Sequence, residues 1–371
     1  MSCSPRRASD ARSTFTIRLT TRDRKVIRLK DVAAHAGVSV TTVSHVVNAT
    51  RPVASATEAR VRESIATLGY RPDSVARALK SNRSRTLGMI VTNAHNPFFA
   101  EVIRGVEDRC YQAGYSLILC NSDDIDAKQL SYLETLRDRR IDGLVVMTAE
   151  NGAGFLEALS ALPLPTVMMD AEPQPGWDMT VVNDDSYLGG RLAIEHLLAQ
   201  GIERIALLTG PRDHARSRER LGGALEALYA AGLGLAEDWQ IATQLMLADG
   251  HRAAHLLLAN PADRPDAIFA FNDLLALGCL RAAQDLEIKV PQQLSIIGYD
   301  DIEISAYLSP ALTTIRQPIY ELGTTAVDQL IARLEGTPFP GQTQLAPRLV
   351  ERDSVARPGQ CLQTTFKHSQ A

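Results

Sequence analysis

The stretch LKDVAAHAGVSVTTVSHVVN, from Leu29 to Asn48, decides how the first part of this 371-residue chain folds. Its apolar residues begin at helical spacing, which predicts a first helix with a buried face at Leu29, Val32, Ala33 and Ala36. Gly37 supplies the backbone freedom that ends this helix. A second helix follows almost at once, because Ser39 is placed to cap it.

The second predicted helix has an apolar side and an outward side. Its buried residues are Val43, Val46 and Val47, and its outward residues are Val40, Thr41, Thr42, Ser44 and His45. Two short helices joined by a glycine turn are typical of the helix-turn-helix, whose second helix enters the DNA major groove. Together with Ser39, the short outward side chains can reach phosphates and base edges without filling the groove. On pattern alone, a helical hairpin in a globular core is the alternative.

The net charge of −4 hides an asymmetry along the chain. Residues 1–85 contain 17 Lys and Arg against 6 Asp and Glu, a net +11, whereas the remainder contains 22 against 37, a net −15. A basic head on an acidic body predicts that the head is the part that attracts nucleic acid. The composition, 45% hydrophobic and 22% charged, is typical of a soluble chain with two or three domains.

The five cysteines are scattered and include no C-x-x-C pair, which favours reduced cytoplasmic thiols over a disulfide framework or a zinc site. No apolar run is long enough to span a bilayer, and the charged N-terminus does not match a signal peptide. We therefore expect a cytoplasmic protein that makes no membrane contact.

The sequence predicts five consecutive regions. They are a disordered basic arm, a helix-turn-helix domain, a hinge helix with its linker, a core and a tail, at residues 1–26, 27–71, 72–85, 86–356 and 357–371. The arm is either a tail that strengthens DNA attraction or an extension upstream of the true start. The third helix of the head should open with a capping box from Ser55 to Glu58 and end at Gly69. The hinge helix is too short to be stable unless a partner or DNA packs against it.

Short apolar strands alternate with helices throughout the predicted core. The strands are LGMIVT, YSLILCN, DGLVVMTA and PTVMMD, followed by MTVVND, RIALLTG, DAIFAFN and LSIIGYD. This alternation predicts an α/β fold of parallel sheets covered on both faces. We expect two similar lobes with about five strands each. Lobe 1 would comprise about residues 86–183 and 318–343, and lobe 2 about residues 184–317 and 344–356.

Polar and aromatic residues follow the predicted strands, at the sheet edge where α/β proteins bind ligands. They are Asn96, Phe98 and Phe99, then Asp170, the stretch from His214 to Arg220, Asn272, Asp300 and Gln317. Aromatic rings stack on the C–H faces of a sugar, and the polar groups exchange hydrogen bonds with its hydroxyls. The set predicts a polyol or sugar site, although each residue alone is also typical of a turn, a helix cap or a core.

Three motifs of the first region, LKDVAAHAGVS, TTVSHVVN and VARALKSN, resemble the DNA-binding head and hinge of the LacI/GalR transcription regulators. Within that family the ribose and purine repressors are the most similar, and the resemblance covers about residues 27–355. It implies contacts to bases and phosphates from Thr41, Thr42 and His45, and a minor-groove wedge at Leu79 with its neighbour Lys80. Val40 replaces the usual Thr and would meet a thymine methyl.

The core motifs NPFF, ARSRERLGG, FAFND, GYDD and TTIRQP resemble the ribose-binding pattern of periplasmic sugar-binding proteins. The resemblance implies one wall of Asn96, Phe98 and Phe99, hydroxyl contacts from Asp170, Arg220 and Asn272, and closure by Asp300 and Gln317. Two positions depart from the pattern. Ala171 stands where Arg or Trp is expected, and Leu245 stands where a third aromatic is expected. A furanose, pentose or nucleoside-like ligand remains compatible with both.

These observations predict a ligand-responsive repressor that binds double-stranded operator DNA as a homodimer and uses no cofactor. Resemblance to ribose repressors implies release from DNA by a pentose such as ribose. Resemblance to purine repressors implies a purine or nucleoside corepressor instead. A pure sugar carrier is a weaker alternative, because it needs no DNA-binding head and would be exported.

The sequence argues against an enzyme. Motifs for nucleotide binding, zinc proteolysis and serine hydrolysis do not occur. His251 and His255 are spaced i, i+4 but have no evident carboxylate partner in the sequence, so we expect them to be ordinary helix surface and predict no metal site.

Overall fold

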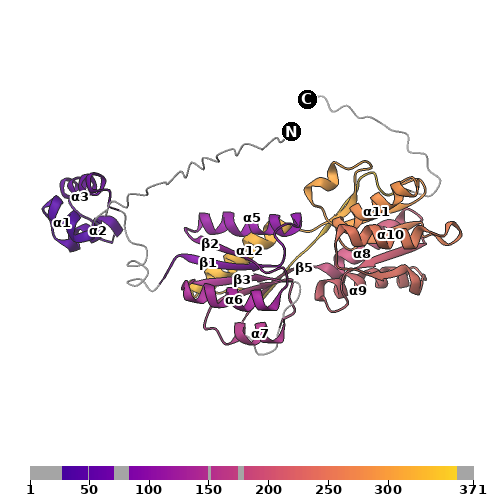
Figure 1. Cartoon of the computed structure of the whole chain (residues 1–371), viewed down its shortest axis with the longest axis horizontal. Helices are drawn as coiled ribbons and strands as arrows, with labels where there is room; N and C mark the ends of the chain where they lie inside the picture. Colours follow the sequence, from indigo (N-terminus) through magenta and orange to yellow (C-terminus); the bar gives the residue numbers. More distant parts are fainter. Residues whose placement is uncertain (1–26, 49, 71–82, 149–151, 174–178, 357–371) are drawn as a thin grey trace, which may run out of the picture. The chain divides into compact units, whose positions relative to one another are not determined.

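The computed structural model describes residues 27–48, 50–70, 83–148, 152–173 and 179–356. The chain divides into two compact units, a head within residues 1–80 and a core within residues 81–371 (Figure 1). The predicted arm and tail, most of the predicted hinge, and with it Leu79 and Lys80, lie outside the described residues.

Three helices form the head: α1 (Leu29–Ala36), α2 (Val40–Asn48) and α3 (Ser55–Leu68). Their shared core contains Val32, Ala33, Ala36, Val43 and Val61. Gly37 and Gly69 follow α1 and α3 with φ of 63° and 62°, in the left-handed region that glycine adopts without steric cost. The predicted helix-turn-helix is therefore confirmed.

The capping box predicted at the start of α3 is wrong. Ala54 occupies the N-cap position of α3 and makes no side-chain cap. The helix begins at Ser55 itself, so the Ser55 hydroxyl lies within the first turn rather than ahead of it. Glu58 instead forms an ion pair with Arg62 at 2.6 Å, one turn further along the helix.

The first lobe of the core is a six-stranded parallel sheet in the order β11-β5-β4-β3-β1-β2. Its strands are β1 (Thr86–Val91), β2 (Ser116–Asn121), β3 (Gly143–Met147), β4 (Thr166–Met169), β5 (Thr180–Asp184) and β11 (Gln342–Leu345). Helices cover both faces of this sheet (Figure 1). On one face lie α5 (Pro97–Gln112) and α12 (Ile319–Glu335), and on the other lie α6 (Asp126–Asp138) and α7 (Ala153–Ser160).

The second lobe is another six-stranded sheet, in the order β12-β10-β9-β8-β6-β7. Its strands are β6 (Ile205–Thr209), β7 (Gln240–Ala242), β8 (Ala267–Ala270), β9 (Ser295–Asp300), β10 (Thr313–Arg316) and β12 (Arg348–Val350). The helices pack in two pairs, α8 (Ser186–Ala199) with α9 (Ala215–Ala230), and α10 (Leu247–Leu258) with α11 (Asp273–Asp285). Short 3₁₀ turns lie at Glu237–Trp239, Pro261–Asp263 and Glu303–Ala306.

The predicted fold class, a helix-turn-helix head with a two-lobed α/β core, is confirmed, with corrections to the strands. Strands β7, β10, β11 and β12 were not predicted, so each sheet has six strands rather than about five. The segment MTVVND is β5 and pairs with β4 in the first sheet, and all of it but its last residue falls within the bounds expected for lobe 1. Strand β12 pairs with β10 in the antiparallel direction, so the second sheet is mixed.

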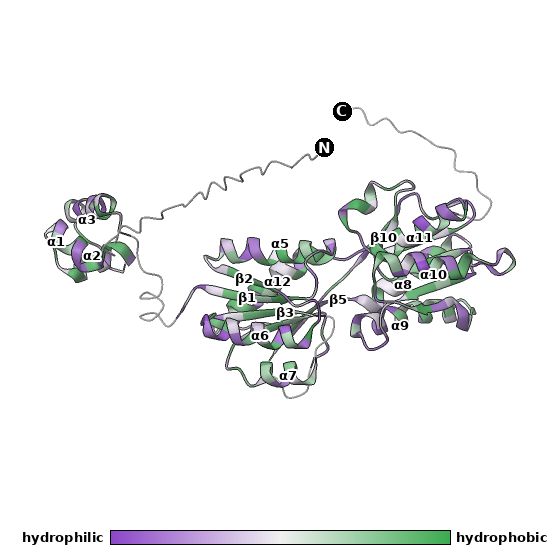
Figure 2. Ribbon diagram, viewed as in Figure 1, coloured by the Kyte–Doolittle hydropathy of each residue, from purple (hydrophilic) through white to green (hydrophobic). Residues whose placement is uncertain are grey.

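The chain passes between the two lobes three times. It crosses after β5, again after β10, and finally between β11 and β12. The apolar strands lie inside each lobe and the helices turn their polar sides outward (Figure 2). Among the described residues, no helix is both long and apolar enough to cross a membrane.

Candidate functional site

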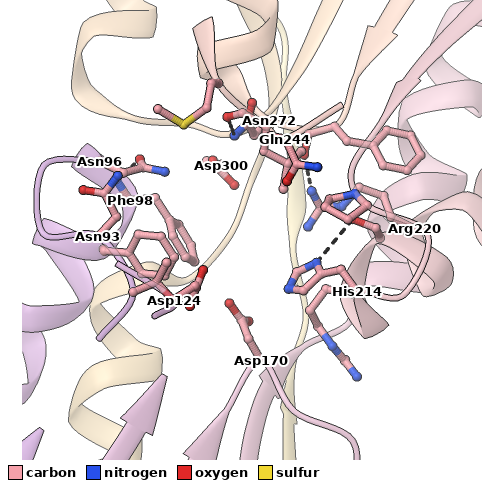
Figure 3. A pocket seen from close by; sticks show the side chains of 18 of the residues that line it. Asn93, Asn96, Phe98, Asp124, Asp170, His214, Arg220, Gln244, Asn272 and Asp300 are labelled. Atoms are coloured by element: carbon pink, nitrogen blue, oxygen red, sulfur yellow. Dashed lines mark hydrogen bonds between the residues drawn. The ribbon is translucent and has the colours of Figure 1, made fainter. Parts of the chain in front are cut away.

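All eight predicted ligand residues line one cavity of about 320 Å³ between the lobes of the core (Figure 3). Lobe 1 contributes Asn96, Phe98, Phe99 and Asp170, and lobe 2 contributes Arg220, Asn272, Asp300 and Gln317. They meet because most of them follow the carboxyl end of a parallel strand, and both sheets direct these ends towards the cavity.

The lobe 1 wall is built on the start of α5. The Asn96 side chain accepts a hydrogen bond from the Phe98 backbone N–H at 3.0 Å and so caps the helix. The rings of Phe98 and Phe99 meet edge to face, with centroids 5.1 Å apart. Figure 3 shows Phe98 and Asp170 directed into the cavity, so this wall offers both an apolar ring and a carboxylate.

On the lobe 2 side, Arg220 is the centre of a buried network. Its guanidinium lies 3.3 Å from the ring centroid of Tyr299 and donates to the Phe271 carbonyl oxygen and, at 3.2 Å, to the Ser186 hydroxyl. Asp184 accepts hydrogen bonds from the Tyr299 and Ser186 hydroxyls at 2.7 and 2.9 Å. Because Asp184 ends β5 at the first crossover, Arg220 links the cavity to a strand that joins the lobes.

Two carboxylates face the cavity in environments that disfavour their charge. Burial, and then the nearby Asp184 carboxylate, raise the pKa of Asp170 to about 6. Burial and the neighbouring Asp273 carboxylate raise the pKa of Asp300 well above its usual range. The Gln317 side-chain amide donates a hydrogen bond to Asp300 at 2.7 Å, and this hydrogen bond partly offsets the rise in the Asp300 pKa that burial causes.

A histidine beside Arg220 stays neutral at physiological pH. Burial, with the charges of Arg220 and Arg216, lowers the pKa of His214 to about 4. Its Nδ1 lies 3.3 Å from the Ser217 hydroxyl. Arg216 forms a two-point ion pair with Glu219 at 2.6 and 2.8 Å. The uncharged His214 ring therefore offers hydrogen bonding to the cavity without adding to its charge.

Several buried polar atoms at this cavity have no hydrogen-bond partner among the described residues. They are Nε of Arg220, Oε1 of Gln317, Nε2 of His214 and Nε of Arg216. Unpaired buried polar atoms are rare in native proteins, because each loses its hydration without compensation. These atoms have almost no solvent-accessible surface, so they lie behind the cavity wall, within the side chains that support it.

The backbone has positive φ at five residues of the cavity. Asp123, Asp124, Asp170, Leu245 and Asp300 have φ of 52°, 53°, 52°, 59° and 115°, in a region that residues with a Cβ rarely adopt. Such strain is retained where the surrounding structure fixes a side chain for a purpose other than stability. It is concentrated here where strands end and side chains turn towards the cavity.

The second helix of the head presents the predicted DNA-facing residues at its start. The Ser39 hydroxyl accepts from the Thr42 backbone N–H at 3.1 Å, which confirms that Ser39 caps α2. Val40 is 46% exposed and Thr41 is also exposed. His45 is half-buried, with its Nδ1 2.8 Å from the Thr50 hydroxyl. An open N-terminal turn is what a recognition helix needs to approach base edges.

Comparison with known proteins decides the family. The profile of the bacterial regulatory proteins of the lacI family matches residues 28–73, and that of the periplasmic binding protein-like domain matches residues 194–355. The ribose operon repressor of Escherichia coli is 43% identical over 329 residues, which is 88% of this chain and 99% of the relative. The chain belongs to the LacI family. It is a LacI-family DNA-binding transcriptional repressor.

Other relatives and solved structures agree with this assignment to the LacI family. The repressor PurR of Aliivibrio fischeri is 43% identical over 88% of this chain and 98% of its own length. The lac repressor dimer bound to operator and the anti-inducer ONPF superposes with a TM-score of 0.81 and 29% identity, over 90% and 100% of the two chains. A LacI-family regulator of Enterococcus faecium with bound ribose has a TM-score of 0.66 and 32% identity, over 73% and 99%.

The structure of this LacI-family repressor also places residues that the sequence analysis did not select. Asn93, Asp124 and Gln244 line the cavity (Figure 3). Asn93 and Asp124 follow the ends of β1 and β2, so the strand-end argument applies to them as well. Gln244 follows β7, a strand that was not predicted.

The two departures from the ribose-binding pattern have different positions in this LacI-family core. Leu245 lines the main cavity, and its carbonyl oxygen accepts a hydrogen bond from the Asn272 side chain at 2.9 Å. Ala171 is buried and lines a second cavity of about 340 Å³, which shares Asp170 with the first. An Arg or Trp at position 171 would occupy the second cavity from this side.

One prediction about this LacI-family core is wrong. His251 and His255 do have a carboxylate partner, because Asp285 of α11 lies 2.8 Å from Nε2 of His251 and 3.7 Å from Nε2 of His255. The sequence did not reveal it, since Asp285 is on a different helix and reaches α10 only through packing of the two helices.

Proposed function

We propose that this LacI-family repressor controls a ribose-type sugar catabolic operon and is released from its operator by an unphosphorylated pentose such as ribose. Its similarity to the ribose operon repressor supports the operon class. The related regulator that holds ribose supports the effector class. On this proposal, the protein acts in the cytoplasm and has no catalytic role.

The observation that carries the effector proposal is the mixed set of donors and acceptors on the side chains that line the cavity. Arg220 is a donor, the amides of Asn272 and Gln317 both donate and accept, and Asp170 and Asp300 add carboxylate oxygens. A sugar hydroxyl both donates and accepts, so adjacent hydroxyls can satisfy this mixed set. The Phe98 and Phe99 rings provide the apolar surface against which C–H groups of the sugar ring pack.

The charge of the cavity favours a neutral sugar over its phosphate. Asp123, Asp124 and Asp170 line the cavity with two arginines, Arg216 and Arg220, while the raised pKa of Asp300 favours its neutral form. Arg216 is already paired with Glu219, which leaves little positive charge for a phosphate. We expect ribose 5-phosphate to bind at least about tenfold more weakly than ribose, because like charges repel in a partly buried site.

The second candidate is a corepressor response to a purine base or nucleoside. It is favoured by the equal identity to PurR and by the two residues that depart from the ribose-binding pattern. A small Ala171 leaves space beside Asp170, and Leu245 presents an aliphatic surface in place of an aromatic ring. Both changes are compatible with a ligand larger than a pentose.

DNA recognition is assigned to the head. On this proposal Thr41, Thr42 and His45 contact bases and phosphates, Ser39 positions the helix, and Val40 meets a thymine methyl. Leu79 and Lys80 are proposed to wedge into the minor groove from the hinge. A homodimer is expected, because two heads then bind the two halves of a near-palindromic operator. Light scattering that gives a mass near four chains would contradict the dimer.

On this proposal, the two lobes of the core couple ligand binding to DNA binding. A ligand held by both lobes favours one angle between them, and three crossovers are the points at which that angle changes. If the two hinges order together only at one lobe angle, ligand and operator affect each other reciprocally, by about 1–3 kcal/mol.

The test combines ligand titration with DNA binding. A duplex selected from a random library supplies the operator, and its affinity is measured by fluorescence anisotropy with and without each ligand. D-ribose that binds in calorimetry and weakens DNA binding would support the proposal. A purine or nucleoside that binds and strengthens DNA binding would establish the second candidate instead. If neither class of ligand binds, the assignment of the cavity as the effector site is overturned. If no duplex is selected from the library, the assignment of the head as the DNA-binding domain is overturned.

A further inference from the structure

A cluster of metal-ligating side chains lies on lobe 2, among residues outside the ligand cavity. His251 and His255 are one turn apart on α10, and their rings meet edge to face with centroids 4.6 Å apart. The Oδ2 atom of Asp285 lies 2.8 Å from Nε2 of His251 and 3.7 Å from Nε2 of His255. One ligand atom from each of these three residues lies within 4.8 Å of the other two.

The two helices that carry these residues are held at a fixed, close separation. A Cβ added at Gly250 of α10 would overlap the backbone oxygen of Leu275, and a Cβ added at Gly278 of α11 would overlap that of Leu247. Glycines at both positions therefore let the helix backbones touch. Because both helices are fixed by this contact, Asp285 is presented to the histidine pair without a loop that must first become ordered.

The donor set fits a divalent transition-metal cation. Two imidazoles at i, i+4 on a helix can bind one Zn²⁺ from the same side, and a carboxylate oxygen completes three protein ligands. The side chains of His251, His255 and Asp285 are 34%, 36% and 28% exposed, so a water molecule can complete a tetrahedral shell. Imidazole and carboxylate together suit Zn²⁺ better than Mg²⁺ or Ca²⁺, which take oxygen ligands.

A neighbouring arginine orients the carboxylate. Arg281 pairs with Oδ1 of Asp285 at 2.8 Å and so leaves Oδ2 directed at the two histidines. Partners of this kind, behind a metal ligand, fix its orientation and strengthen metal binding. The Arg281 side chain is 63% exposed, so it can move away from Asp285 at little cost in free energy when a bound cation adds positive charge.

We propose that His251, His255 and Asp285 form a surface site for Zn²⁺ or a similar divalent transition metal, which clamps α10 to α11. When the metal binds, the proton between Nε2 of His251 and Oδ2 of Asp285 moves to Nδ1 of the ring or leaves to solvent, and all three residues ligate the cation. The bound state therefore gains a metal link between two helices that already meet through packing, the His251–Asp285 hydrogen bond and the hydrogen bond from the Cys279 thiol to the Gly250 carbonyl oxygen. A cation bound only by the folded core stabilises it.

The experiment measures Zn²⁺ binding to the full chain by competition with a chromophoric chelator. The test variant is the double substitution His251→Ala and His255→Ala. The matched control is His95→Ala, which removes an exposed histidine from the other lobe, lobe 1. We expect the wild type and His95→Ala to bind one Zn²⁺ equivalent more than the double variant. Equal Zn²⁺ binding by wild type and double variant would overturn the site.

The role of Asp285 is tested separately. Asp285→Asn keeps the size of the side chain and removes the charged ligand, so Zn²⁺ affinity should fall at least about tenfold. Zn²⁺ should also raise the melting temperature of the wild-type core and leave that of the double variant unchanged. Unchanged Zn²⁺ affinity in Asp285→Asn would show that α10 binds the metal alone, and would overturn the clamp between the helices.

Discussion

Arg220 is the residue that joins the cavity to the connection between the lobes. It lines the cavity, stacks on Tyr299, and donates to Ser186, which in turn donates to Asp184 at the end of β5. A lysine has neither the planar face for stacking nor several donors in a fixed geometry. A change at this position should therefore affect ligand binding more than its charge alone would indicate.

Arg220→Lys should weaken binding of the effector by about 10- to 100-fold, since a charged hydrogen bond and its stacking contact are lost. Calorimetric titration with ribose measures the change, and circular dichroism confirms that the variant folds. Arg218→Lys is the matched control, because Arg218 is 45% exposed and pairs with Glu172 outside the main cavity. Affinities that are equal in the two variants would contradict the role given to Arg220.

Asp170 makes the stability of the core depend on pH. Its pKa is raised from 3.8 to about 6 in the folded protein, mainly by burial. A raised pKa means that the folded state favours the protonated form, so the contribution of Asp170 is greatest below pH 3.8 and is lost as the pH rises through 6. Ionised Asp170 therefore costs stability at pH 7.

Asp170→Asn should raise the free energy of unfolding at pH 7 by about 1–2 kcal/mol, less than the full shift because the side chain is partly open to solvent. The gain should be mostly gone at pH 4, where Asp170 is already protonated in the folded state. Urea unfolding of wild type and variant at both pH values measures this difference. A gain that persists unchanged at pH 4 would assign the effect to something other than ionisation.

The residues at the cavity show which parts of a site can be predicted from sequence. Asp170, Asn272 and Asp300 were predicted to meet because the strand-end rule depends only on recognising parallel strands. The partnership of Asp285 with His251 and His255 was missed, because it depends on how closely two helices pack. Such packing is set by glycines that have no pattern of their own in the sequence.

At the scale of elements, reciprocal glycines determine how closely the helices of the core approach. A Cβ at Gly190 of α8 would overlap the carbonyl oxygen of Arg220, and a Cβ at Gly223 of α9 would overlap that of Tyr187. The same arrangement occurs between α5 and α12 at Gly105 and Gly323. Because each overlap is with backbone, no side-chain rotation can relieve it.

Gly223→Ala should lower the free energy of unfolding by about 1–3 kcal/mol, because α8 and α9 must separate to admit the methyl group. Gly154→Ala in α7 is the matched control. A Cβ there would have no heavy atom within 4 Å, and Gly154 is not at positive φ. The control should be neutral or stabilise by up to about 1 kcal/mol. Urea denaturation distinguishes the two, and equal effects would contradict the packing argument.

The start of α2 offers a test that separates folding from DNA binding. Asp caps a helix as well as Ser does, so Ser39→Asp should keep the head folded, whereas Ser39→Ala should cost about 1 kcal/mol. The added negative charge would lie near DNA phosphates if the proposed docking is correct. Ser39→Asp should then weaken operator binding at least about tenfold in fluorescence anisotropy. Normal operator affinity in this variant would exclude α2 as the recognition helix.

Apolar strands were easier to predict than short strands rich in polar residues. Strands β1 and β9 are six residues long and mostly apolar, and even the four-residue strands β4 and β8 are apolar enough to be predicted. Strands β7 and β12 have three residues each, β10 and β11 have four, and all contain polar residues. Such a run has no clear pattern of its own, and it becomes a strand because a neighbouring sheet edge offers hydrogen bonds.

At the scale of the whole molecule, the chain has two units that should unfold separately. The head has its own core, while the two lobes share three crossovers and the buried network around Arg220. Scanning calorimetry should therefore show a small transition for the head and one larger transition for the core. Effector at 100 times its Kd should stabilise only the larger transition, by about 2.7 kcal/mol. A ligand that shifts both transitions equally would contradict the independence of the head.

The late position of β11 and α12 in the chain has a consequence for synthesis. The first lobe begins at β1, yet its sheet is completed by β11, and α12 shares the covering of one face with α5; β11 and α12 both follow almost all of lobe 2 in sequence. A ribosome therefore releases the head in a foldable form early, while one sheet face of lobe 1 is covered by α5 alone until translation has nearly finished. An unfinished lobe of this kind exposes apolar surface on the nascent chain, which is where a chaperone would be needed.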